Sequence, residues 1–361
     1  MIIYSLIGCG RISANHIKSA VANSLTLSAV CDLIPENMET VLTQHSLEGN
    51  DTISRYTDYR KMLTEKKPQL VAIATDSGSH AQIALDCIES GCHVIIEKPI
   101  ALSLADVNEI IRRAREKGTL VCACHQNRFN VSIQHIRKAI EQGRFGKISH
   151  GSVHVRWCRD KKYYEQASWR GTWAKDGGVL MNQSIHGIDL LRWMLGDDIE
   201  EVFAYTAKQF HHYIECEDVG LAVVKFKNGA LGTIEGTTNV FQKNLEETLY
   251  VFGEKGTVKA GGKSVNNLEV WQFSDSQPGD EELESGLFEQ VSNVYGNGHI
   301  SLYKDMITSI ESGKQPYVDA EAGKRALELV LAIYKSAAEG RPVKLPLEEC
   351  CILEFEGSSF L

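Results

Sequence analysis

The sequence has no apolar run approaching the ~20 consecutive residues that a membrane-spanning helix needs. It also has no long run of basic residues, and 47 acidic against 38 basic side chains give a net charge of −9. The first absence predicts a protein without a membrane span, and the second argues against broad nucleic-acid binding. The apolar start, residues 2–7, is too short for a secretory signal, so we expect a cytoplasmic protein.

Cysteines are present, but none of the ten forms a C-x-x-C pair. Several fall in segments that are typical of buried strands, which favours reduced core residues over a disulfide framework or a zinc site. The segment 211–218 is rich in His, Glu and Asp, yet its spacing matches neither a zinc finger nor an H-E-x-x-H motif. We therefore expect no metal site.

The chain has 361 residues, more than one hydrophobic core usually holds, so two domains are expected. The pattern of strands and helices changes between a first and a second part. The first part alternates short apolar strands with helices, the pattern of a doubly wound parallel sheet. Its strands are predicted at 2–7, 25–31, 53–56, 70–74, 93–96 and 120–124, and its helices include 81–90 and 104–117, with Asp58 and Ser103 as helix N-caps.

The second part begins with a helix over 132–142 and continues as segments of alternating polarity, which predict a large antiparallel sheet. Asn228-Gly229 is a strong hairpin signal between two of these segments. The strands are predicted at 148–155, 202–207, 219–225 and 231–236, and two helices at 300–312 and 320–339 complete the fold. The fold class is thus α/β, with a Rossmann domain over 1–127 and an α+β domain for substrate binding and oligomerisation over 128–361, whose last helices return to the first domain.

A glycine-rich turn follows the first strand and opens the first helix. Gly8 and Gly10 allow a tight turn in which backbone amides, together with Arg11 and Ile12, can approach a pyrophosphate. The third glycine of the usual G-x-G-x-x-G fingerprint is replaced by Ser13. Asp32 ends the second strand, near the spacing expected of an acid that binds the adenosine ribose. A carboxylate there repels a 2′-phosphate and favours NAD over NADP, whereas a Rossmann domain without a dinucleotide would leave it as a solvated strand end.

Two further loops are expected at the same edge of the sheet. Thr75, Ser77 and His80 follow the fourth strand and most simply flank the cofactor, although helix capping would look similar. Glu97-Lys98-Pro99 follows the fifth strand, and Pro99 ends that strand because it has no backbone donor. The carboxyl edge of an open parallel sheet is where such folds bind their ligands, so we expect the Lys98 ammonium to be catalytic.

A second cluster of polar residues lies beyond residue 165. Trp169 and Arg170 precede a glycine pair, and a helix that starts after that pair would place Asn182 and His186 on one face. A histidine on a helix is more often a core or surface residue than a catalytic one, so this cluster gains meaning only together with the first.

Taken together and in this order, the motifs resemble the glucose-fructose oxidoreductase, inositol dehydrogenase and rhizopine-catabolism (Gfo/Idh/MocA) family, over nearly the whole chain. That resemblance implies that Lys98 and His186 flank the reacting carbinol beside the nicotinamide of NAD. Asn182 stands where many sugar dehydrogenases of the family have aspartate, which speaks against a simple Asp-His dyad. The cofactor contacts would extend to Glu97, Asn127, Trp169 and Arg170.

The sequence is most similar to the nucleotide-sugar branch of that family, which oxidises C3 of UDP-N-acetyl-2-amino-2-deoxyglucuronate in surface-polysaccharide synthesis. This branch implies a substrate with carboxylate and diphosphate charges, which local cations must receive. Arg159 is the preferred anion contact among the cations that precede Asn182, although an exposed charged loop explains them equally well. Further substrate contacts are expected from Tyr163, Tyr164 and Tyr295.

Oxidation of a secondary alcohol needs a proton acceptor and a donor to the developing alkoxide. His186 suits the first role and Lys98 the second, but a lysine with a lowered pKa could exchange roles with it, and both assignments stay open. Asn182 more plausibly orients a sugar hydroxyl. The alternatives are a dehydrogenase of a free sugar or inositol, an NAD-dependent glycosidase, or a non-catalytic sensor that keeps the dinucleotide site. By analogy with the family we expect a homodimer or homotetramer.

Overall fold

The computed structural model describes residues 2–291 and 293–358, and the chain forms two compact units. The first unit contains the residues up to His125 together with His299–Lys324. The second contains Gln126–Gly298 and the residues from Arg325 onward. A segment far along the chain therefore completes the first unit.

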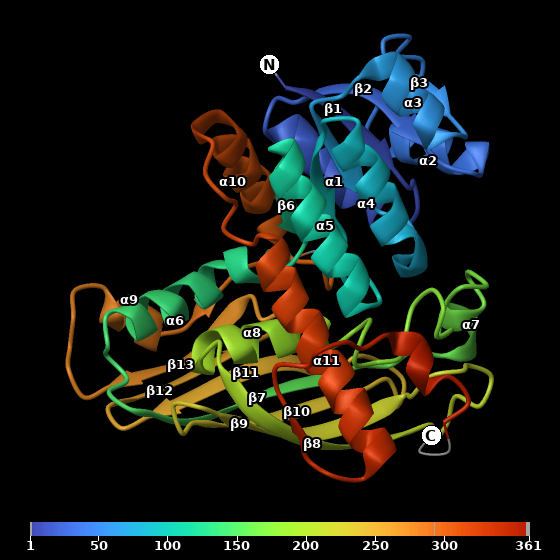
Figure 1. The fold of residues 1–361 in the computed structure, drawn as a ribbon. Coiled ribbons are helices and arrows are strands. Elements are labelled where there is room, and N and C mark those ends of the chain that lie inside the picture. Colours follow the sequence, from blue (N-terminus) through green and yellow to red (C-terminus); the bar gives the residue numbers. More distant parts are fainter. Residues whose placement is uncertain (1, 292, 359–361) are drawn as a thin grey trace. The chain divides into compact units, whose positions relative to one another are not determined.

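The first unit is built on a six-stranded parallel sheet in the order β3-β2-β1-β4-β5-β6 (Figure 1). The central strands are almost entirely apolar and buried, as parallel strands covered on both faces must be. This confirms the predicted doubly wound sheet, with small shifts at the strand ends. The strands are β1 (Ile3–Ile7), β2 (Thr26–Cys31), β3 (Ser54–Tyr56), β4 (Leu70–Ile73), β5 (His93–Ile96) and β6 (Val121–Ala123).

Helices alternate with these strands, and the two predicted N-caps are confirmed. The Asp58 carboxylate accepts hydrogen bonds from the backbone N–H groups of Arg60 and Lys61, and the Ser103 hydroxyl accepts one from Asp106. The helices are α1 (Ser13–Ala22), α2 (Pro35–Gln44), α3 (Tyr59–Lys66), the short η1 (Ser77–Ser79), α4 (His80–Glu89) and α5 (Leu104–Lys117), to which the late segment adds α10 (Gly298–Ser312).

The second unit is built on a nine-stranded sheet in the order β14-β13-β12-β11-β7-β10-β9-β8-β15. Neighbouring strands are antiparallel except β7 and β10, so the predicted antiparallel sheet is confirmed. The predicted Asn228-Gly229 hairpin joins β9 to β10, and Gly229 adopts the positive φ of 88° that the turn requires. The strands are β7 (Ile148–Arg156), β8 (Ile199–Ala207), β9 (Val219–Phe226), β10 (Leu231–Thr237), β11 (Glu246–Gly253), β12 (Gly256–Gly261), β13 (Asn267–Phe273), β14 (Leu287–Phe288) and β15 (Val343–Lys344).

Helices cover one face of this sheet (Figure 1). Helix α8 packs on β7, β10 and β11, and α11 is tied to β8 by a hydrogen bond from the Ala204 N–H to the Ser336 hydroxyl. Along β9 and β10 buried and exposed residues alternate, so the opposite face stays exposed. The helices are η2 (Gln126–Phe129), α6 (Val131–Glu141), α7 (Lys161–Tyr164), α8 (Ile185–Leu195), α9 (Asp280–Glu284), α11 (Ala320–Glu339) and η3 (Ile352–Phe355).

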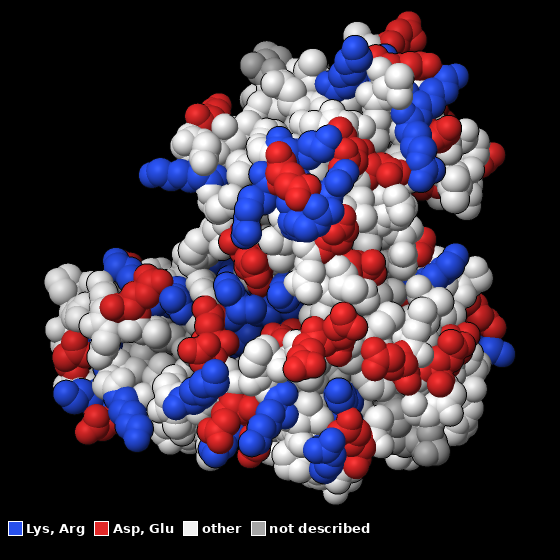
Figure 2. Space-filling model, viewed as in Figure 1, with Lys and Arg blue, Asp and Glu red and all other residues white. Residues whose placement is uncertain are grey.

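Acidic and basic side chains are interspersed over the face drawn in Figure 2. Helix α5 is an example, since Arg112 pairs there with Glu109 and Glu116 one turn away on either side. Such exposed pairs mainly keep a helix face solvated. No helix in the described part of the chain is both long and apolar enough to cross a membrane.

Candidate active site

The glycine turn after β1 is shaped by close backbone contacts within the first unit. Gly8 has a φ of 93°, and a Cβ there would overlap the Ala74 carbonyl, so only glycine fits. Gly10 is exposed, and a Cβ built on it would meet nothing within 4 Å. The turn is therefore packed on one side and open on the other, which leaves room for a ligand at the start of α1.

Asp32 lies beside this turn at the end of β2. One carboxylate oxygen accepts the Cys9 N–H at 2.7 Å, and the other accepts the Ile34 N–H at 2.8 Å and the Asn37 side-chain amide at 3.1 Å. The carboxylate is only partly buried. An acid fixed next to an open glycine turn fits the ribose of a dinucleotide. Arg11 is exposed and Ile12 is the N-cap residue of α1.

The loop after β4 is closed by internal hydrogen bonds. The Ser79 hydroxyl donates to the Thr75 hydroxyl at 2.8 Å, and Ser77 opens the short helix η1. His80 is buried, and its Nδ1 lies 2.8 Å from the carbonyl oxygen of Pro99. Burial lowers the pKa of His80, so the ring is neutral and donates this hydrogen bond. The predicted cofactor loop is thus tied to the strand end that carries Lys98.

Lys98 is the second residue after β5, at the carboxyl edge of the parallel sheet. Strand β5 pairs with β4 on one side and β6 on the other, so Lys98 lies between the ends of two neighbouring strands. Its side chain is half-buried, and its backbone N–H donates to Glu97 Oε2 at 3.1 Å. The fold therefore places a cation where such sheets bind ligands.

The prediction that one helix carries both Asn182 and His186 is wrong. Helix α8 begins at Ile185, so His186 lies in its first turn and Asn182 precedes it. The segment that precedes α8 is a turn, in which the Asn182 N–H donates to the Gly178 carbonyl at 2.9 Å. The Asn182 side-chain amide donates to the buried carboxylate of Asp176. An acid six residues upstream therefore holds Asn182.

Glu217, on the segment that leads into β9, forms hydrogen bonds that hold the same turn. Its Oε1 accepts the Leu180 N–H and the Tyr334 hydroxyl, each at 2.9 Å. A Cβ at Gly178 would overlap this carboxyl group, which explains the glycine. Burial raises the pKa of Glu217 to about 8, so the group is mainly protonated at neutral pH.

We expect the contribution of Glu217 to the free energy of unfolding, measured as the difference between the parent and Glu217→Gln, to fall as the pH rises from about 5 to 8. The folded chain keeps the Glu217 proton in this window, whereas the unfolded chain, with an ordinary carboxyl pKa near 4.5, has released it. The stabilisation that the Glu217 proton contributes to the folded chain therefore decreases by roughly 2 to 4 kcal/mol across this window. Denaturant titrations of both proteins at several pH values measure this difference. A difference that stays constant across the window would contradict the assignment.

His186 is buried among residues of η2 and α8. Its Nε2 lies 3.4 Å from the Gln126 side-chain amide. One turn further along α8, Asp189 accepts two hydrogen bonds of 2.6 Å from Arg128 of η2. This buried pair fixes α8 against η2, and with it the histidine against Gln126.

Arg159 and Arg170 form an alternating stack with three aromatic rings. The Arg159 guanidinium lies 4.6 Å from the Trp157 ring centre and 4.9 Å from that of Tyr163, and Arg170 lies 4.3 Å from Tyr163 and 4.7 Å from Trp169. Among the described residues neither arginine pairs with a carboxylate, and the Nε atom of each is buried without a hydrogen-bond partner. Two guanidinium groups without carboxylate partners, both stacked on Tyr163, suit an anion.

The remaining predicted contacts also belong to the second unit, and Tyr164 packs edge-on against Tyr163 with ring centres 5.1 Å apart. Tyr164 is buried, with its hydroxyl 3.4 Å from that of Thr238. Asn127 is also buried and donates to Glu247 at 3.1 Å. Tyr295 lies in a turn where its N–H donates to the Asn293 side chain. Arg156 is occupied by Glu235 and Glu246, which leaves Arg159 and Arg170 for an anionic ligand.

Sequence reasoning missed four buried polar residues: Asp176, Glu217, His16 and His299. Asp176 precedes the glycine pair in the sequence, and Glu217 packs against Gly178. The glycine pair itself was therefore the only local signal for these two residues. His16 and His299 are 283 positions apart in the sequence, and both contact Glu97. No local pattern connects such residues.

Two family models match the chain. One, described as an oxidoreductase family with an NAD-binding Rossmann fold, covers residues 2–125. The other, the C-terminal alpha/beta domain of the same oxidoreductase family, covers residues 137–345. Together they span most of both units.

Among solved structures, the chain is similar to the WlbA dehydrogenase of Bordetella pertussis, in complex with NADH and UDP-GlcNAcA. The identity is 36%, the TM-score is 0.86, and the match covers 96% of this chain and 99% of that one. The WlbA dehydrogenase of Chromobacterium violaceum, bound to the same two ligands, shares 36% identity with a TM-score of 0.87 over 96% of each chain. Myo-inositol 2-dehydrogenase of Thermotoga maritima is 27% identical over 94% of this chain and 97% of its own length.

Proposed function

Because the chain belongs to the Gfo/Idh/MocA family of NAD-dependent oxidoreductases, we propose that it oxidises a secondary hydroxyl of a nucleotide sugar. The preferred substrate is UDP-N-acetyl-2-amino-2-deoxyglucuronate, oxidised at C3 as a step of surface-polysaccharide synthesis. The observation that carries this choice is the pair of stacked arginines without carboxylate partners, Arg159 and Arg170. The two similar dehydrogenases bound to NADH and UDP-GlcNAcA support it.

The catalytic roles follow from the chemistry of alcohol oxidation. NAD, when bound, accepts the hydride. In the preferred assignment His186 takes the hydroxyl proton, and the Lys98 ammonium donates to the oxygen as negative charge develops on it. Asn182, fixed by Asp176, orients a neighbouring hydroxyl. The reverse assignment, with Lys98 as the proton acceptor, uses the same two side chains.

The substrate anions are received by the stack around Tyr163. Arg159 is held by the Asn244 side chain at 2.9 Å and by the Cys158 carbonyl at 2.7 Å, while Arg170 donates to the Tyr163 hydroxyl at 2.6 Å. Guanidinium groups fixed in this way can bind a diphosphate or carboxylate without first being ordered. A free sugar or inositol has no group that uses both cations.

A screen for NADH formation tests this proposal. The purified protein is incubated with NAD and, separately, UDP-N-acetylglucosaminuronate, UDP-N-acetylglucosamine, free uronates, inositols and an aryl glycoside. We expect NADH only with the UDP-uronate. A response to free polyols alone would favour a sugar or inositol dehydrogenase, and cleavage of the glycoside without net NADH would favour a glycosidase.

Asp32→Ala tests the preference for NAD. Loss of the carboxylate removes its bonds to the adenosine ribose and its repulsion of a 2′-phosphate. We expect NAD to bind ~10-fold more weakly, about 1.4 kcal/mol, while NADP gains relative to NAD. Titration of protein fluorescence with both reduced cofactors measures the two affinities. An unchanged preference would refute the assignment.

The exposed face of the second unit's sheet supports self-association. Tyr205, Leu221 and Val223 lie on adjacent strands of this face and are 68%, 52% and 54% exposed. An apolar strip on an open sheet suits a second copy of the same chain. Leu221→Asp should shift the sedimentation coefficient toward the monomer, whereas Lys243→Asp, at an exposed loop position, should not. A monomeric parent protein would contradict the proposal.

A further inference from the structure

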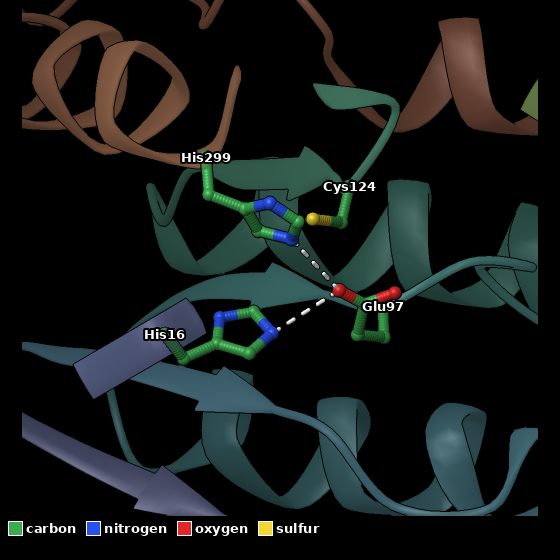
Figure 3. Close-up of side chains that lie close together, drawn as sticks. All are labelled: His16, Glu97, Cys124 and His299. Carbon is green, nitrogen blue, oxygen red and sulfur yellow. Dashed lines mark hydrogen bonds and ion pairs between the residues drawn. The ribbon is translucent and has the colours of Figure 1, made fainter. Parts of the chain in front are cut away.

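Four polar side chains from distant parts of the sequence meet at a buried point of the first unit (Figure 3). Glu97 comes from the end of β5, His16 from α1, Cys124 from the end of β6 and His299 from the start of α10. His16 and His299 are 0–3% exposed, and Glu97 is 6% exposed. Glu97, which the family resemblance implies as a cofactor contact, takes part in this buried cluster immediately before Lys98.

The Glu97 carboxylate is the acceptor at the centre of this cluster. Its Oε1 lies 3.1 Å from His16 Nε2 and 3.4 Å from His299 Nε2, and Figure 3 shows both rings directed at this oxygen. Its Oε2 accepts the backbone N–H of Lys98 at 3.1 Å. Burial alone would raise the pKa of Glu97, but the hydrogen bonds from both histidines outweigh it and hold the pKa well below its usual range.

The protons of the network can be assigned from its partners. His16 Nδ1 lies 2.8 Å from the Tyr303 hydroxyl, whose oxygen is 2.8 Å from that of Tyr4. The tyrosine donates to Nδ1, so the His16 proton is on Nε2 and points at Glu97. Burial lowers the pKa of His299, so its ring is neutral and donates from Nε2. Tyr4 is fully buried, hence the chain of bonds ends in the core and offers no proton path to solvent.

The same four side chains could in principle bind a metal, but the hydrogen bonds argue for a network. Both imidazoles already direct an N–H at one carboxylate oxygen, and the pKa of the Cys124 thiol is raised well above its usual range by burial. The buried anion therefore has its partners without an ion.

We propose that Glu97, with His16 and His299, is a positioning site for Lys98. The carboxylate fixes the Lys98 peptide through its N–H and keeps a negative charge one residue away from the ammonium, while His80 holds the Pro99 carbonyl at 2.8 Å on the other side. Lys98 is thus held from both neighbours. Because His16 belongs to the helix that opens at the glycine turn, the same bonds connect the cofactor turn with the catalytic lysine. The inference rests on the catalytic role proposed for Lys98.

Glu97→Gln is the direct test, because glutamine has the same shape but no charge. We expect kcat to fall ~10- to 100-fold through misplacement of Lys98, with the affinity for NADH within about twofold of the parent. Loss of the neighbouring anion should also shift the pH profile of kcat and lower the pH at which the Lys98 amine becomes reactive. The reactivity of the Lys98 amine is measured by amine-reactive labelling at several pH values, followed by mass spectrometry. This measurement needs no substrate, so it tests the positioning of Lys98 even if the proposed reaction is wrong.

Two variants of His299 keep the test informative if Glu97→Gln folds poorly. His299→Gln retains an N–H donor and should keep more activity than His299→Ala, whereas Glu109→Gln, an exposed substitution on α5, should behave as the parent. The proposal is overturned if Glu97→Gln keeps the parental kcat and labelling profile, or if it loses NADH binding while the labelling of Lys98 is unchanged. One tightly bound zinc ion per chain in the parent, measured by mass spectrometry, would also overturn it.

Discussion

Lys98→Ala is expected to lower kcat by ~10²- to 10⁴-fold while the dissociation constant for NADH changes less than about threefold. In the proposed mechanism the ammonium supplies charge at the oxygen of the reacting alcohol, and this interaction strengthens only as the alkoxide develops. Its loss therefore raises the barrier and leaves ground-state binding nearly unchanged. Steady-state NADH formation gives kcat, and fluorescence titration gives the affinity. Full activity in this variant would exclude a catalytic role for Lys98.

Two matched variants sharpen that result. Lys18→Ala removes an exposed ammonium from α1 in the same unit and should leave kcat unchanged. Lys98→Arg keeps the charge but replaces a compact ammonium with a planar, always protonated group, so activity should stay low if Lys98 must fit closely or exchange a proton. A nearly active arginine variant would show instead that positive charge alone suffices.

Much of the first unit follows from local sequence, because its signals are short-range. A glycine turn after an apolar strand, an acid at the end of the next strand and a proline after β5 each depend on a few neighbouring residues. The fold class, the family and the cofactor could be predicted for this reason, and all three are confirmed. The hairpin at Asn228-Gly229 is predictable in the same way.

The buried polar networks could not be predicted, because their members are far apart in the sequence. His299 reaches Glu97 only because a late segment completes the first unit, and Asp176, which precedes the turn, binds the Asn182 side chain. The expected helix around Asn182 failed for a related reason. The Glu217 carboxyl group binds the Leu180 N–H and so stabilises a turn where a helix was expected to start after the glycine pair.

Asp189→Asn is expected to reduce the free energy of unfolding by ~3 to 5 kcal/mol. Asp189 is fully buried and accepts two bonds from Arg128, and Arg192 approaches it at 3.4 Å. Removal of the charge leaves two buried guanidinium groups facing a neutral amide, and burial already lowers the pKa of Arg192. Urea unfolding followed by circular dichroism measures the loss. A change below about 1 kcal/mol would show that water or a local shift compensates.

Asp197→Asn is the matched control, since Asp197 also pairs with Arg192 but is 53% exposed. Water screens the exposed Asp197 carboxylate, and Arg192 keeps its contact with Asp189 when Asp197 is neutralised, so the same chemical change should affect unfolding much less. The two variants also separate stability from function. Asp189 fixes α8 against η2, so Asp189→Asn should move His186 relative to Gln126 and lower kcat even at temperatures where the protein stays folded. If Asp189→Asn kept the parental kcat there, the pair would stabilise the fold without orienting His186.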